Sequence, residues 1–154
     1  MLFPYFQALE NMRIGEIIRD SVWLFPFIEA VHLVALAVIG GAVLVVDFRL
    51  LGLGLTGESP ASLERAARPW LLSSLLVLLT SGAVLFLSEA VKCYYSFAFW
   101  VKMAALLTVI VFTYTVRRRV AVAAGSSGRM RLVGLISIGL WSLVGWGGRW
   151  IGFS

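Results

Sequence analysis

Hydrophobic residues occur along the chain in four long blocks that are separated by short polar segments. Each block holds about 20 residues, the length of helix needed to cross a hydrocarbon core of about 30 Å. The blocks lack the regular alternation of apolar and polar faces that marks surface helices of soluble proteins. Pro69 precedes the second block as a helix start. The pattern predicts four membrane-spanning helices over residues 22–46, 70–87, 97–116 and 132–153.

The residues before the first block follow another pattern. Over residues 5–19, apolar side chains such as Phe6, Ile14 and Ile18 alternate with charged ones at helical spacing. An amphipathic helix of this kind lies in the membrane interface. The segment lacks the features of a signal peptide, so we expect it to stay attached. The sequence thus predicts an all-α integral membrane four-helix bundle with a short interfacial N-terminal helix, residues 1–154 forming a single membrane domain.

The composition excludes a water-soluble enzyme. Hydrophobic residues make up 60% of the 154 residues and charged residues 14%, whereas soluble domains have about 45–50% and about 25%. The single cysteine, Cys93, excludes an internal disulfide and a CxxC motif. The neighbouring Lys92 could lower the pKa of this thiol, although an inert interfacial cysteine is the alternative. The single histidine, His32, excludes a multi-histidine metal site within one chain.

The net charge of +5 comes from basic residues that cluster between the predicted spans. The pattern indicates membrane topology rather than nucleic-acid binding. The basic residues of the first and third connections are Arg49, Arg65, Arg68, Arg117, Arg118, Arg119, Arg129 and Arg131. The positive-inside rule places these two connections in the cytoplasm and both termini outside. We expect a multi-pass protein of the bacterial inner (cytoplasmic) membrane.

Four ionisable side chains lie inside the predicted spans: Glu29, His32, Lys102 and Arg149. With a rise of about 1.5 Å per residue, Glu29, Lys102 and Arg149 fall about 8–10 Å to the outer side of the midplane. His32 lies one turn deeper on the same helix face as Glu29. Ionisable groups inside spans are costly and usually face the bundle interior, so this layer is the candidate functional site. Alternatively, Glu29 neutralises Lys102 or Arg149 and fixes the helices in register.

A histidine in an apolar helical bundle is a suitable axial ligand for haem iron. In this hypothesis His32 binds haem b, Glu29 orients the other ring nitrogen, and Lys102 and Arg149 pair with the propionates. Met103 or a second protomer supplies the sixth ligand, or the iron stays five-coordinate. The function would then be membrane electron transfer.

Two other functions stay open. Small residues such as Gly40, Gly41 and the Gly148-xxx-Gly152 pair favour close helix contacts. The chain could therefore be a cofactor-free accessory subunit of a larger membrane complex, or a homo-oligomer. Copper handling is the weaker alternative, because the methionines, Cys93 and His32 are soft ligands without MxxM or CxxC spacing.

Several motifs also carry a family resemblance. They are Glu29-x-x-His32, the turn Asp47-x-Arg49-Leu-Leu-Gly, the Phe99 to Met103 segment and the Gly148-Arg149 ending with its Ile and Phe. With these motifs, spread over nearly the whole chain, the sequence resembles a family of uncharacterised bacterial four-span membrane proteins. More distantly, the Phe-x-x-Lys-Met arrangement is similar to copper-resistance protein D and membrane cytochrome b groups. In those groups histidines inside the membrane bind haem or metal, so the resemblance favours a cofactor site at His32.

Overall fold

The computed structural model describes residues 2–123 and 125–153, and within them it contains helices and connections but no strand. Four long apolar segments form the bundle. They are α3 (Leu24–Leu51), α4 (Pro60–Ser88), the continuous run of α6 (Phe97–Phe112), η1 (Thr113–Arg117) and α7 (Arg118–Ala123), and α8 (Ser127–Ile151). Each is long and apolar enough to cross a membrane. The predicted all-α four-helix membrane bundle is confirmed.

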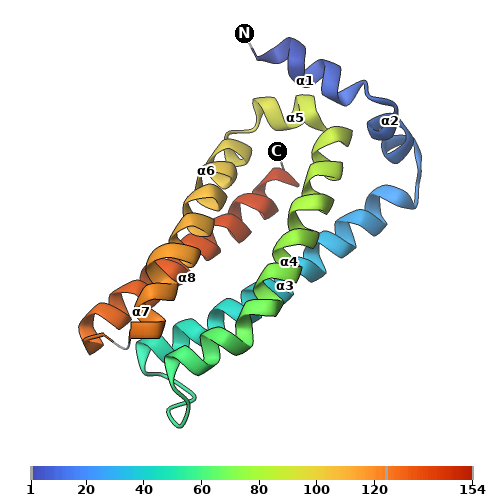
Figure 1. The fold of residues 1–154 in the computed structure, drawn as a ribbon. Helices are drawn as coiled ribbons and strands as arrows, with labels where there is room; N and C mark the ends of the chain where they lie inside the picture. The colour runs from blue at the N-terminus through green and yellow to red at the C-terminus, as the bar shows by residue number, and fades with distance from the viewer. Residues whose placement is uncertain (1, 124, 154) are drawn as a thin grey trace.

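The long helices pack as antiparallel neighbours (Figure 1). Helix α3 contacts both α4 and α8, and α6 contacts α8. The short helices α1 (Phe3–Glu10), α2 (Arg13–Asp20) and α5 (Ala90–Tyr95) lie at one end of the bundle. Both ends of the chain lie there too, whereas the connection after α3 and the one between α7 and α8 lie at the opposite end. We call these the terminal end and the connection end.

The helices are longer than the apolar blocks indicate. Helix α4 begins at Pro60 rather than near residue 70, because the Ser59 hydroxyl accepts a hydrogen bond from the Ser62 N–H (3.1 Å) and proline suits the first helical turn. Pro69 therefore lies inside the helix and does not start it. Helix α3 continues past residue 46 to Leu51, where Gly52 adopts a left-handed conformation (φ 78°) and ends it.

The N-terminal segment forms two helices instead of one over residues 5–19. The break falls between Asn11 and Met12, where Met12 is extended. Helix α2 packs against α4 so closely that a Cβ on Gly15 would collide with the Leu87 carbonyl oxygen. Its other face leaves Ile14 exposed beside charged side chains. This is the amphipathic pattern of an interfacial helix.

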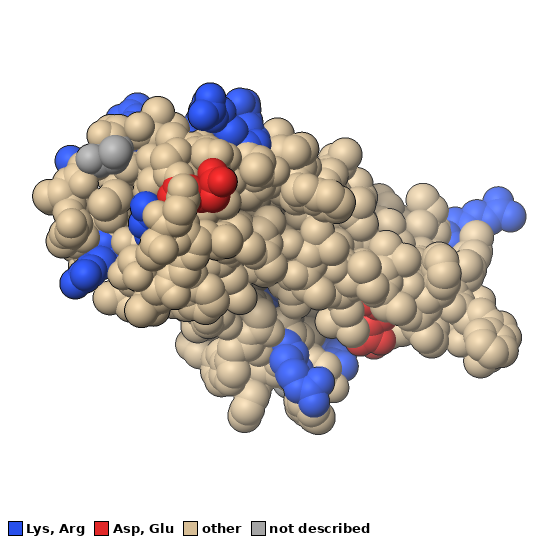
Figure 2. Space-filling model, turned by 90° about the horizontal axis from the view of Figure 1, so that it is seen from below, with Lys and Arg blue, Asp and Glu red and all other residues tan. Residues whose placement is uncertain are grey.

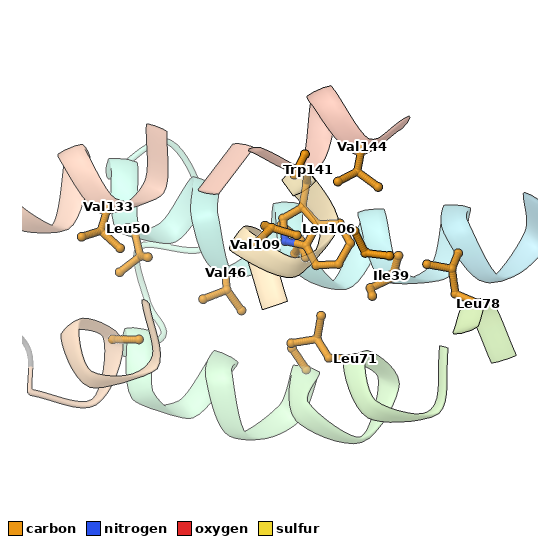
Figure 3. Close-up of a cluster of buried hydrophobic side chains, with 14 of the residues drawn as sticks. Ile39, Val46, Leu50, Leu71, Leu78, Leu106, Val109, Val133, Trp141 and Val144 are labelled. Carbon is orange, nitrogen blue, oxygen red and sulfur yellow. The ribbon is translucent and has the colours of Figure 1, made fainter. Parts of the chain in front are cut away.

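The core is a stripe of apolar side chains along the bundle axis. It includes Ile39, Leu71, Val109, Trp141 and Val144, which point toward one another from all four long segments (Figure 3). Only 28–33% of the residues in the most apolar part of each span are buried within the chain. Most of the apolar surface therefore faces outward, where lipid would cover it.

Basic residues dominate the charged surface. Viewed from below, Lys and Arg side chains stand out at several points and acidic ones are few (Figure 2). Arg65 and Arg68 belong to the first turns of α4, and Arg129 and Arg131 to the first turns of α8. The connection end therefore carries most of the arginines, as the sequence predicts.

Candidate functional site

A cavity of about 490 Å³ lies between the long helices at the terminal end, and all four candidate site residues line it: Glu29, His32, Lys102 and Arg149. Its volume falls within the range of about 300–1,000 Å³ that is usual for small-molecule sites. The rest of the wall is largely apolar. Aromatic side chains contribute to it, namely Phe25, Phe86, Phe99 and Phe153. The structure thus brings together Glu29 and Arg149, which are 120 positions apart in the chain.

The side chain of His32 is half-buried and held at one ring nitrogen. Its Nδ1 lies 2.9 Å from the Oγ of Ser81 on α4. The Ser81 hydroxyl donates its own hydrogen to the Val77 carbonyl (2.6 Å), so it accepts from Nδ1–H. We therefore assign the neutral tautomer with the proton on Nδ1, which leaves the Nε2 lone pair available.

The absence of a side chain at Gly82 leaves room for the His32 imidazole ring against α4. A Cβ at Gly82 would lie 3.1 Å from Cε1 of His32 and 3.6 Å from Nδ1. A side chain at position 82 would therefore require the imidazole ring to move by a few tenths of an ångström. Ser81 and Gly82 therefore position the histidine from the neighbouring helix, one by a hydrogen bond and the other by leaving space.

Lys102 crosses the surface of α8 at two adjacent glycines. A Cβ on Gly147 would lie 3.1 Å from the Cβ of Lys102, and one on Gly148 would lie 3.3 Å from its Nζ. Lys102 is half-buried, and within residues 2–123 and 125–153 no carboxylate lies within ion-pair distance of it. The cavity thus holds a cation for which the described residues supply no ionic partner.

The expected roles of Glu29 and Met103 differ from the structure. Glu29 lines the cavity, but it forms no ion pair with Lys102 or Arg149 in the described part of the chain. The hydrogen bond that orients His32 comes from Ser81 instead. Met103 is 44% exposed and does not belong to the cavity wall, because it follows Lys102 by one position and so points elsewhere around α6.

Arg149 stands at the mouth of the cavity. Its side chain is exposed, and the guanidinium carbon lies 5.2 Å from the centroid of the Phe153 ring. This distance is that of a cation–π interaction. In the described part of the chain Arg149 forms no ion pair, so its guanidinium could bind an anionic group at the mouth.

Cys93 on α5 also lines the cavity and is buried. Burial raises the pKa of its thiol to about 11, and the nearby Glu89 carboxylate adds to the rise. Lys92 pairs with Glu89 (3.8 Å) and only partly offsets the effect. Of the two interpretations of Cys93, the raised pKa contradicts a thiol activated by Lys92 and agrees with an inert cysteine, because desolvation is the larger effect.

A second polar cluster, which the sequence analysis missed, lies toward the connection end. Arg117 Nε donates to Asp47 Oδ1 (2.7 Å), Nη1 donates to Glu64 Oε2 (3.1 Å), and Nη2 donates to the Val43 carbonyl (3.3 Å). The Asp47 and Arg117 side chains are fully buried and that of Glu64 is 7% exposed. Arg117 is thus a structural group of the bundle rather than a charge of the third connection, and Asp47 belongs to helix α3 rather than to a turn.

The spacing of apolar and small residues along α4 indicates which of its side chains face the interior of the bundle. The buried positions of α4 recur at alternating steps of four and three: Pro60, Glu64, Ala67, Leu71, Ser74, Leu78 and Ser81. The same stripe predicts that Glu64 and Ser81 face inward. In the third segment, the wider turn of η1 keeps Thr113 and Arg117 on the buried face of Val109.

Metal binding by clustered protein ligands finds no support in the described residues, where no group of three or more His, Cys, Asp or Glu side chains could hold an ion.

Comparison with known protein families matches residues 6–154 to a family of unknown function, DUF6644. No curated protein and no solved structure gives a significant match. The similarity to copper-resistance protein D and membrane cytochrome b groups stays a prediction. The family match includes every residue of the cavity wall and of the buried cluster. The chain belongs to the family of unknown function DUF6644.

Proposed function

We propose that this membrane protein binds haem b in the terminal-end cavity, with Nε2 of His32 as an axial ligand, and takes part in electron transfer. The observation that carries the proposal is the hydrogen bond between His32 and Ser81 (2.9 Å). It places the proton on Nδ1 and leaves Nε2 as an available lone pair in a largely apolar cavity. Haem-ligating histidines commonly have this arrangement, with the other ring nitrogen held by a hydrogen bond.

The chemistry of the cavity wall fits the rest of the group. A b-type haem has a flat apolar face and two carboxylates. The aromatic side chains of the wall suit the face, and Lys102 and Arg149 are cations that lack ion-pair partners among the described residues. A propionate beside Lys102 would offset the cost of keeping an ammonium group in the membrane.

The protein residues have separate tasks in this proposal. Bound haem would supply one-electron redox chemistry. Ser81 holds the imidazole and fixes its tautomer, while Gly82 leaves room for the ring. The apolar wall excludes water from the site. Met103 lies outside the wall, so we propose one axial ligand from this chain.

Absorption spectra of the oxidised and dithionite-reduced protein, purified in detergent from cells supplied with a haem precursor, test the proposal together with a haem extraction assay. We expect stoichiometric haem in the wild type and its loss in His32→Ala. Met103→Leu, altered outside the cavity wall, is the matched control and should keep the pigment. A His32→Ala variant with a full haem complement would refute the assignment.

A second candidate function is that of a cofactor-free accessory subunit. It is supported by a shallow groove of about 360 Å³ on the outer face of α3 and α4, whose wall includes Gly41, Ala42, Ala66 and Ala67. Small residues of this kind allow close contact with another helix in the membrane. A colourless wild-type protein that co-purifies with other membrane proteins would favour this candidate over haem binding.

A further inference from the structure

The buried cluster around Arg117 contains two acidic side chains and one basic side chain. Asp47 from α3 and Glu64 from α4 both accept hydrogen bonds from the single guanidinium group. If all three groups were ionised, the cluster would carry a net charge of −1 with almost no exposure of its side chains. An uncompensated charge at such a site is very costly, and buried groups usually become neutral instead.

The surrounding charged groups do not compensate for this charge. On α4, Arg68 is exposed and forms no ion pair with either carboxylate within the described residues. Tyr114 on η1 lies near Glu64 and Arg117 and is neutral at physiological pH. Helix α8 faces Asp47 with the hydroxyl of Ser137. A proton on one carboxylate is the simplest compensation.

The orphaned atoms show where that proton would sit. Among the described residues, Oδ2 of Asp47 is buried without a hydrogen-bond partner, and so is Oγ of Ser137. Both residues are fully buried, and Gly134 lets α8 approach closely, since a Cβ there would lie 3.1 Å from the Asp47 carbonyl oxygen. The Ser137 hydroxyl lies beside Asp47, where it can donate to an ionised carboxylate and accept from a protonated one.

We propose that Asp47 and Glu64 share one bound proton at neutral pH, so that this cluster is a proton-binding site toward the connection end. Uptake forms one O–H bond on Oδ2 of Asp47, with the proton taken from hydronium and a water molecule left behind. Glu64 is the only one of the three side chains that is not completely buried. Asp47 lies about 22 Å along α3 from His32, so the site is separate from the cavity and does not depend on haem.

Infrared spectroscopy of the wild-type protein tests the proposal directly. We expect the carbonyl band of a protonated carboxylic acid at neutral pH, which shifts after exchange into D₂O. The chain has two aspartates, Asp20 and Asp47, and Asp20 is exposed. Labelling aspartate with carbon-13 should therefore move the band, which assigns it to Asp47 without any substitution.

Substitutions of Asp47 and Glu64 test whether the proton is bound because of the excess negative charge or only because Asp47 is buried. Asp47→Asn should remove the band. Glu64→Gln should remove it as well, because Asp47 and Arg117 then form a neutral pair without the proton. Glu58→Gln, in the exposed connection after α3, should leave the band unchanged. Ser137→Ala should shift the band and retain its intensity, since only its hydrogen-bond acceptor is lost.

Two outcomes would overturn the proposal. The first is a wild-type spectrum without the band, which means that both carboxylates are ionised. The second is a band that does not respond to labelled aspartate. If the band is absent and the thermal stability rises with Na⁺ but not with an equal concentration of choline, the cluster binds a metal cation instead of a proton. The infrared spectrum of the wild-type protein tests the proposal even if a variant fails to fold.

Discussion

The Nε atom of Arg117 lies 2.7 Å from Oδ1 of Asp47, although the two residues are 70 positions apart in the chain. This bond joins the third span to the first, and the bond from Arg117 to Glu64 adds the second span. Substituting Arg117 with Gln should lower the free energy of unfolding by about 3–5 kcal/mol, because two buried carboxyl groups lose their cation. Thermal unfolding in detergent, followed by circular dichroism, measures the effect.

Arg118 provides the matched control for this prediction. It is the next residue in the chain, carries the same charge and is exposed. Arg118→Gln should change the stability by no more than about 0.5 kcal/mol. Equal losses in the two variants would mean that the arginines act through the overall charge of this end and not through the buried cluster.

The tautomer of His32 can be observed directly, because the chain has one histidine. In haem-free protein labelled with ¹⁵N-histidine, NMR should show a protonated Nδ1 and an unprotonated Nε2, as the bond to Ser81 requires. Ser81→Ala should produce a mixture of tautomers because the acceptor for Nδ1–H is lost. Gly82→Ala should have a similar effect by displacing the ring.

Ser73 is the control for the tautomer measurement. It also lies on α4, but it is exposed and its hydroxyl bonds only to carbonyl groups of its own helix. Ser73→Ala should leave the histidine spectrum unchanged. A wild-type spectrum with the proton on Nε2 would remove the main support for haem ligation.

The thiol of Cys93 should react slowly in the folded protein. Its pKa is raised from 9.0 to about 11, so the thiolate fraction near neutral pH falls about 100-fold. Alkylation by iodoacetamide should be slow in the folded state, rise with pH and become fast after unfolding in SDS. Between pH 9.0 and about 11 the stability should also fall, because the unfolded state loses its thiol proton first. Fast alkylation at pH 7 would show that Cys93 is accessible and ionised.

The sequence predicts that four ionisable side chains lie close together, because each is a polar residue inside an otherwise apolar block. Glu29, His32, Lys102 and Arg149 each interrupt such a block, and the fixed rise of a helix places them at similar depth. The sequence gives no signal for the role of Ser81, because it is one of three serines in its span and small polar residues are common there. Its role depends on which helix packs against α3, and the order of the spans does not reveal that.

The buried cluster is harder to predict for a different reason. Arg117 begins a run of three arginines after an apolar block, which is also the pattern of a cytoplasmic connection. Only the first of the three is buried, because η1 and α7 continue the helix past the end of the block. Arg117 contacts Asp47 only because the first and third spans pack together. The two residues are 70 positions apart, so no local sequence pattern predicts this contact.

The burial of Arg117 also bears on the orientation of the protein in the membrane. Without it, seven basic residues still belong to the connection end, against Arg13, Arg19, Lys92, Lys102 and Arg149 elsewhere, and two of those five lie within spans. The positive-inside rule therefore still predicts a cytoplasmic connection end. In a Cys93→Ala background, Tyr5→Cys on the exposed face of α1 should react with a membrane-impermeant maleimide in intact spheroplasts. Ser126→Cys, between α7 and α8, should react only after permeabilisation. The reverse result would show that the seven basic residues of the connection end do not determine the orientation of the protein.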